Sequence, residues 1–175
     1  GGNNTFLHVI DANTHSLFLD STNAISGFLI VSNNVTAMGA CTINQAVVAN
    51  PAASLCFANN HSSVISSYEG WGTLKCLGPG TSVTISDLAQ NGLYGSFIAD
   101  GGHLEIHQDS ASHCEVNGDI TILNSGIMDI FGADTHVYLA LNGNVNFTMD
   151  TGYFIIRDQG LRISASAYSC NFNIS

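Results

Sequence analysis

Positive charge is the scarcest property of this chain of 175 residues. Apart from histidine, the cationic side chains are Lys75, Arg157 and Arg162, against thirteen acidic ones, and the formal net charge is −10. Proteins that bind nucleic acid or anionic membrane surfaces need lysine and arginine to neutralise phosphate groups. The composition therefore argues against nucleic acid and anionic membranes as partners.

Long hydrophobic segments are also missing, although 45% of the residues are hydrophobic. No segment approaches the 18 or more apolar residues that a membrane-spanning helix needs, so we expect no membrane insertion. The polar residues are mostly Asn, Ser, Thr and Gly, where a cytosolic enzyme usually carries more Lys and Glu. This composition predicts an extracellular protein, or one exposed on the surface of a cell or particle.

Cysteine is present but in no metal-binding or redox pattern. Five cysteines occur, and even Cys41 and Cys56, the closest pair in the sequence, are too far apart to form a CxxC motif. Free cysteine is among the most buried residue types, and we expect most of these to be small core residues. One or two disulfides remain an alternative for an extracellular chain.

Short alternating apolar segments, separated by tight turns, dominate what is present. They begin at residue 103 and, from residue 119 onward, recur every eight or nine residues, with NG, NSG, GADT, DTG or DQG between them. Such spacing is typical of an all-β solenoid, barrel or sandwich. The segments are HLEIH (103–107), DITIL (119–123), IMDIF (127–131), HVYLAL (136–141), NVNFTM (144–149), YFIIR (153–157), LRISA (161–165) and CNFNI (170–174).

The alternation also assigns faces, because successive side chains of a strand point to opposite sides. The outward set is polar, with Glu105, Thr121, Tyr138, Asn146, Asn171 and Asn173 among its members. The inward set consists of Leu104, Ile106, Ile120, Ile122, Val137, Leu139, Leu141, Val145, Phe147, Met149, Phe154, Ile156, Leu161, Ile163, Phe172 and Ile174.

The first hundred residues are less regular. Two segments carry weak helix signals, TINQAVVANPAASL (42–55), where Pro51 would end a helix, and ISDLAQNGL (85–93). A short helix and a loop are equal alternatives for the first. No linker separates the halves, so the sequence predicts a single all-β domain over 1–175, with an irregular N-terminal region over 1–100 and regular strand-turn repeats over 101–175.

Two architectures fit these strands. A β-solenoid would have about 16 to 18 residues in each coil if it is two-sided, or about 25 if it is three-sided. The NG turns in VNGDI (116–120) and LNGNV (141–145) instead favour antiparallel hairpins, and hence a β-sandwich or jelly roll. The very short strands, preceded by Gly, Asn or Asp, favour the solenoid.

GDITILNSGIMDIFG (118–132) and LALNGNVNFTMDTG (139–152) resemble the repeats of bacterial β-helical surface proteins. These include autotransporter passengers, filamentous-haemagglutinin-like exoproteins and polymorphic outer-membrane proteins. The resemblance covers roughly residues 100–175, and the FxxN and GGA[ILV] tetrapeptides of the polymorphic group are absent. It implies a right-handed parallel β-helix used for adhesion or assembly, and it supplies no catalytic residue.

His103, Glu105 and His107 form the strongest candidate for a metal site, because HLEIH places all three on one side of a strand. Residues two apart on a strand are separated by about 6.6 Å, so Glu105 could share a metal with either histidine. A stacked neighbour such as Asp119 or His136 would have to add a third ligand. The simpler interpretation is a solvated polar face with no metal and no cofactor.

Three acidic residues, Asp100, Glu105 and Asp109, suggest the carboxylate clusters of polysaccharide-cleaving enzymes. No cation lies near them in the sequence to assist such a reaction. His113 and Cys114 are adjacent, which puts them on opposite faces of a strand and separates a nucleophile from its base. We therefore expect no enzymatic activity.

Tyr68 and Trp71 lie in a glycine-containing segment, SSYEGWGTLK (66–75), where they could stack on a sugar ring. The alternative is an aromatic plug that closes one end of the core.

The expected function is that of a structural or adhesive module that self-associates into an oligomer or filament. Phe172 and Ile174 mark the expected assembly edge, because CNFNI (170–174) lacks the Lys or Pro that usually blocks an edge strand. The alternatives are a β-helix that binds or cleaves carbohydrate on glycans or a host surface, and a viral coat or fibre subunit.

Overall fold

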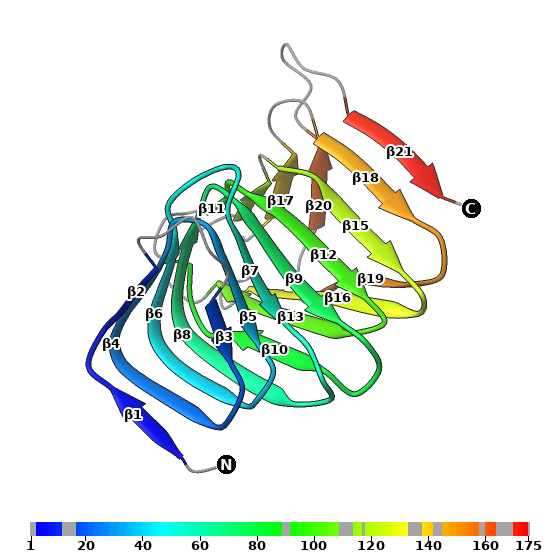
Figure 1. Cartoon of the computed structure of the whole chain (residues 1–175). Coiled ribbons are helices and arrows are strands. Elements are labelled where there is room, and N and C mark those ends of the chain that lie inside the picture. Colours follow the sequence, from blue (N-terminus) through cyan, green and yellow to red (C-terminus); the bar gives the residue numbers. More distant parts are fainter. Residues whose placement is uncertain are drawn as a thin grey trace.

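The chain winds into a β-solenoid built from parallel strands (Figure 1). This computed structural model describes residues 3–11, 17–88, 92–108, 114–116, 118–132, 138–141, 145–157, 160–163 and 170–174. Its described residues contain no helix, and hence none that is long and apolar enough to cross a membrane. The predicted all-β solenoid is confirmed.

Two large sheets form the two long walls of the solenoid, with a smaller third sheet beside them. Sheet A contains β1 (Asn4–Phe6), β2 (Val9–Asp11), β4 (Asn23–Val31), β6 (Cys41–Val48), β8 (Ser62–Gly70), β10 (Ser82–Ile85), β13 (His103–Gln108), β16 (Gly126–Gly132) and β19 (Gly152–Arg157). Sheet B contains β3 (Leu17–Leu19), β5 (Asn34–Ala37), β7 (Ser54–Phe57), β9 (Thr73–Leu77), β12 (Ser96–Asp100), β15 (Ile120–Leu123), β18 (Val145–Met149) and β21 (Cys170–Ile174).

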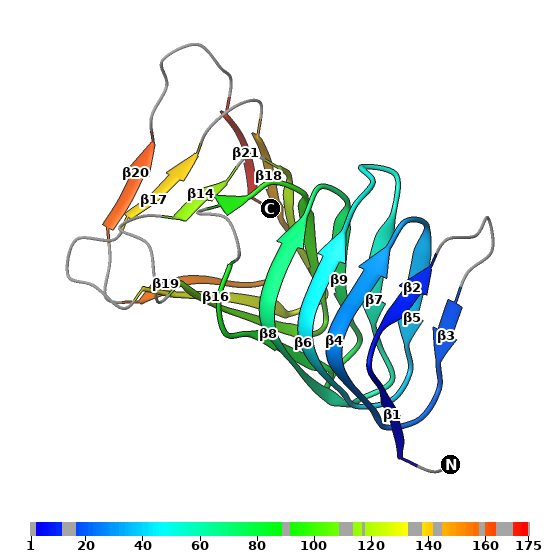
Figure 2. The same cartoon turned by 90° about the vertical axis from the view of Figure 1, so that its left-hand side faces the viewer.

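Sheet C is confined to the second half of the chain. It contains β11 (Gly92–Leu93), β14 (Cys114–Val116), β17 (Tyr138–Leu141) and β20 (Gly160–Ile163). Figure 2 shows β14, β17 and β20 standing apart from β16 and β19, so the solenoid is wider toward its C-terminal end. The register shows the same widening, because Ile25 pairs with Ile43 near one end, whereas Ile130 pairs with the more distant Ile156 near the other. Coils near the shorter predicted length occur at the N-terminal end of the solenoid, and coils near the longer one occur at its C-terminal end.

Every ladder between the named strands is parallel, which excludes the antiparallel sandwich. Of the two NG sequences that suggested hairpins, Gly118 of the first lies at a corner between β14 and β15, and the second, 142–143, lies outside the described residues. A Cβ atom on Gly118 would collide with the backbone of Gly95 one coil below. The glycine therefore serves the close stacking of corners, whereas the glycine of a hairpin turn serves its positive φ.

Each inner position of one coil stacks on the same position of the next coil, and these stacks form the core. The longest stack of a single residue type crosses sheet A and consists of Ile25, Ile43, Ile65, Ile85, Ile106, Ile130 and Ile156. A stack on sheet B faces it and contains Val35, Leu55, Leu74, Phe97, Ile120 and Phe147. All of these side chains are buried except Ile156, which is partly buried.

The predicted inward face is confirmed where the structure describes the side chains. Leu104, Ile106, Ile120, Ile122 and Phe147 are buried. Met149, Phe154 and Ile156 are partly buried and pack against the core. The side chains of Val137, Leu139, Leu141, Val145, Leu161, Ile163, Phe172 and Ile174 lie outside the described residues.

Neither segment with a weak helix signal forms a helix in its described residues, and the loop alternative for the first was wrong as well. Segment 42–55 contains most of β6 and the start of β7, because Ala46, Val48 and Ala53 fill small inward positions of the core. In the second segment, Ile85 ends β10 and Leu88 forms a bridge to β8. Burial of an alternating face outweighed helix propensity at both places.

The half expected to be irregular, 1–100, contains strands β3 to β10, which pair in parallel ladders from coil to coil. Its alternation was hidden because the inward residues of β6 and β8 change parity near the middle of each strand, from Ile43 to Ala46 and from Ile65 to Tyr68. The register of β4 on β6 shifts between Ile25 and Phe28. β4, β6 and β8 curve within sheet A (Figure 1), and a bend of this kind breaks the period of two in β6 and β8.

Candidate functional site

The HLEIH segment forms β13 on sheet A, and its polar side chains all lie half-buried on the outer side. His107 Nε2 and Glu105 Oε1 are 2.6 Å apart. His103 takes no part in this contact, and its buried Nε2 atom has no hydrogen-bond partner within the described residues. The structure thus brings together two of the three predicted ligands.

The next coil places Asp129, not Asp119, beside Glu105. Asp119 lies before a strand of sheet B, where its carboxylate accepts hydrogen bonds from the backbone and side chain of Asn146. The other suggested ligand, His136, falls outside the described residues.

Asp129 is 1% exposed and is held by Arg157 from the following coil. Arg157 Nε lies 3.0 Å and 2.9 Å from the two carboxylate oxygens, and Nη2 donates to Oδ2 at 2.7 Å. This two-pronged contact compensates the buried negative charge with a cation and three donor contacts. The carboxylate is thereby committed to an ion pair.

Phe131 joins these groups into one stack. The ring of His107 lies parallel to it, with ring centroids 4.6 Å apart and planes at 8°. The Arg157 guanidinium lies 5.1 Å from the same ring. Within the described ranges of the chain, no group of three or more His, Cys, Asp or Glu residues could hold a metal. The stack is best explained as a cation–π contact and an ion pair that fasten three coils together.

The three predicted acidic residues do not form a cluster. Asp100 ends β12 on sheet B and accepts a hydrogen bond from Asn124 Nδ2 at 2.6 Å, whereas Glu105 lies on sheet A. Asp109 and His113 lie outside the described residues, as does the side chain of Cys114. Of the other two predicted acids, the one that the structure describes, Asp100, does not lie beside Glu105.

Three described cysteines, Cys41, Cys56 and Cys76, are buried free thiols. Burial raises the pKa of Cys41 and Cys56 and raises that of Cys76 to about 12. A thiol with such a pKa stays protonated near neutral pH and is a poor nucleophile. Cys41 and Cys76 act as small core side chains, as the sequence predicted, whereas Cys56 lies in an outer row of sheet B between Thr36 and Lys75.

The predicted sugar-binding pair is divided between core and surface. Tyr68 is 2% exposed and its ring meets that of Phe97 edge-on inside the solenoid, at 5.9 Å and 66°. Its buried position leaves no ring face for a ligand, so this half of the prediction was wrong. Tyr68 is also not an end plug, because β6 and β10 flank its strand.

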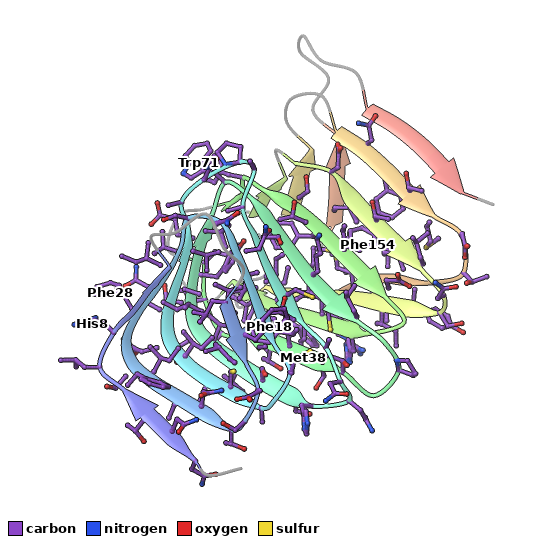
Figure 3. The ribbon with its side chains drawn as sticks, in the orientation of Figure 1. His8, Phe18, Phe28, Met38, Trp71 and Phe154 are labelled. Carbon is purple, nitrogen blue, oxygen red and sulfur yellow. The ribbon has the colours of Figure 1, made fainter. Side chains whose placement is uncertain are left out.

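Trp71 is 48% exposed and projects from the rim of the solenoid (Figure 3). Its neighbour is Tyr94, with ring centroids 5.0 Å apart and planes at 37°. Sequence reasoning missed Tyr94, although WGT (71–73) and YGS (94–96) share an aromatic residue, a glycine and a hydroxyl residue immediately at a sheet B strand.

A shallow hollow of about 290 Å³ lies along the bend of sheet A. None of its side chains is charged and none is a nucleophile paired with a base. The lining residues are Ala24, Ile25, Ser26, Thr42, Asn44 and Ser66.

The predicted assembly edge falls on β21, which is the outermost strand of sheet B. Phe172 pairs in register with Phe147, and Ile174 pairs with Met149. The side chains of Phe172 and Ile174 lie outside the described residues, so only the backbone placement supports the edge.

The β-solenoid is compatible with the resemblance to β-helical repeat proteins, but it does not identify a class of bacterial exoprotein. Comparison of the chain with protein-family models, with curated proteins and with solved structures finds no match.

Proposed function

We propose that the protein is a structural module of a cell, particle or extracellular surface, and that it associates with a second copy through an open sheet edge. The observation that carries this proposal is the position of β19, β20 and β21. Each is the last strand of its sheet and pairs on one side only within the described residues. Unpaired backbone groups along a strand edge are a template for another strand.

The composition of the edge strands supports this association. CNFNI (170–174) contains neither lysine nor proline, the residues that usually block edge pairing. β20 and β19 contribute only Arg162 and Arg157, and Arg157 is bound to Asp129. These edge strands therefore carry few side chains that would prevent pairing with a second copy.

The shape of the two ends favours a closed pair over a filament. The coils are shorter near the N-terminal end than near the C-terminal end, and sheet C is present only at the wider end. Head-to-tail stacking would join unequal cross-sections, whereas two wide ends match each other. Such an isologous contact closes with two-fold symmetry.

Sedimentation velocity over a range of protein and salt concentrations tests the proposal. We expect a dimer whose share rises with protein concentration and with salt, because salt screens the repulsion between chains of net charge −10. The double variant Asn171→Lys/Asn173→Lys puts two cations on β21, at positions that the sequence predicts to be outward, and should shift the protein to monomer.

Thr121→Lys is the matched control, because Thr121 is an outward residue of β15, an inner strand of the same sheet. It should leave the dimer unchanged. A monomer under all conditions would contradict the proposal, as would equal effects of the edge and control substitutions.

A further inference from the structure

The exposed aromatic pair at the rim is the feature that the proposed assembly does not explain. Trp71 follows β8, Tyr94 follows β11, and both precede a strand of sheet B by two residues. The amide of Trp71 donates to Val48 O at 2.9 Å, which ties the residue to the coil below. Because the backbone of this exposed tryptophan is fixed, less conformational entropy is lost when a ligand binds to it.

The corner itself keeps the two rings together. A Cβ atom on Gly72 would collide with the backbone carbonyl of Ala53, and one on Gly95 would collide with that of Gly72. The coils can approach each other at this corner only because both positions are glycine. Their close approach sets the 5.0 Å separation of the Trp71 and Tyr94 rings.

A row of polar uncharged side chains runs along sheet B next to the aromatic pair. It consists of Asn34, Ser54, Thr73 and Ser96, which occupy the same register in four successive strands. Ser54 Oγ donates to Asn34 Oδ1 at 2.7 Å, so one step of the row is already a hydrogen-bonded ladder. Thr73 and Ser96 each lie two residues after an aromatic residue and are half-buried on the outer side.

Charged residues are few around the pair, and Asp119 stands next to Ser96 in the register of sheet B, so the polar row continues into a carboxylate. Residues 21–68 contain no Asp, Glu, Lys or Arg, and the charged residues nearest to Trp71 in the chain are Glu69 and Lys75, one of each sign. A partner rich in phosphate, sulfate or carboxylate would find no excess of cations here. The chemistry suits a ligand that has an apolar face and hydroxyl groups but no charge.

We propose that the Trp71–Tyr94 corner binds a neutral glycan. The apolar face of a pyranose ring packs on the exposed indole, since aromatic side chains combine a large apolar surface with a fixed orientation. The hydroxyl groups of the sugar exchange hydrogen bonds with Thr73 and Ser96, which can each donate and accept. Glycan binding at this corner does not require the dimer, so an experiment can contradict one of the two proposals and leave the other standing. Because the surface is a strip rather than an enclosed pocket, each site binds weakly.

The test uses the full chain coupled to fluorescent beads on an array of neutral oligosaccharides, with sialylated, sulfated and uronic-acid glycans on the same array. We expect retention on neutral glycans of hexose or N-acetylhexosamine. The best of them is then titrated in solution against emission from Trp71, which is the single tryptophan of the chain. Retention of none of the neutral glycans, or emission that does not respond to a retained one, overturns the proposal.

Variants locate the site. Trp71→Ala should weaken bead retention about tenfold or more, because it removes the stacking surface. Tyr153→Ala, which removes a 65% exposed aromatic residue from the outer side of sheet A, should retain wild-type binding. Equal binding by Trp71→Ala and wild type would place the glycan elsewhere and overturn the proposal. Matching thermal unfolding curves establish that both variants are folded.

Two further measurements address other occupants of the corner. Phosphatidylcholine vesicles that shift the Trp71 emission, with no effect of neutral glycans, would assign the corner to a membrane interface. Loss of dimer in Trp71→Ala, again with no effect of glycans, would assign it to a second copy of the chain. Either result contradicts glycan binding.

Discussion

Replacing Ile122 by aspartate should prevent the protein from folding. Ile122 is fully buried on sheet B, between Ala99 and Met149 of the adjacent coils. The substitution removes a core side chain, at about 2–5 kcal/mol, and also buries a group that must lose either its hydration or its charge. The sum is comparable with the whole stability of a typical domain, about 5–15 kcal/mol.

Thr121→Asp is the matched control, one residue earlier on the same strand. Thr121 is half-buried on the outer side, between Ile98 and Thr148. Its replacement should cost about 1 kcal/mol or less. Far-UV circular dichroism and urea unfolding compare the two variants. Similar stability of both would show that the inner and outer faces are assigned wrongly.

The Phe97 ring should account for the second largest effect. Phe97 is fully buried on sheet B and meets Tyr68 of sheet A edge-on across the core. Phe97→Ala should lower the free energy of unfolding by about 3–5 kcal/mol, because the rigid stack of coils cannot collapse into the cavity. Phe18→Ala, which removes a 63% exposed ring from β3, should change it by about 0.5 kcal/mol or less.

Tyr68→Phe tests the other side of the same contact, and here we expect the free energy of unfolding to rise and not to fall. The buried Tyr68 hydroxyl has no hydrogen-bond partner within the described residues. Burial raises the pKa of this phenol, which therefore stays neutral, but a neutral hydroxyl without a partner is also costly. The variant keeps the ring and should raise the free energy of unfolding by about 1 kcal/mol. Equilibrium urea unfolding measures both changes, and a destabilised Tyr68→Phe would contradict this description of the core.

The strand alternation after residue 103 was enough to predict the fold class and the buried face. The longest core stack was not predictable, because its isoleucines are separated by unequal lengths of chain and show no fixed period. Loops of different length restore the same register in space, and sequence spacing alone does not show this. In β6 and β8 the bend also reverses the alternation halfway along the strand.

The candidate sites were predictable only within one strand. The contact between Glu105 and His107 follows from their spacing on β13. The ion pair of Asp129 with Arg157 joins residues 28 positions apart, and the pairing of Trp71 with Tyr94 crosses from one coil to the next. Both contacts depend on the number of residues in each coil, for which the sequence allowed two different values. Tyr68 was misplaced because its inward direction is set beyond the bend of β8.

Distances between paired spin labels along sheet B test the parallel solenoid most directly. Phe18, Lys75 and Thr148 occupy one outer row, with three strand spacings from β3 to β9 and six from β3 to β18. Labels introduced through a ketone-bearing unnatural residue leave the buried cysteines intact.

At about 4.8 Å for each spacing, the solenoid predicts about 14 Å between positions 18 and 75 and about 29 Å between positions 18 and 148. A distance from 18 to 148 that is equal to or shorter than the distance from 18 to 75 would contradict it, because strands stacked in this order must move steadily apart.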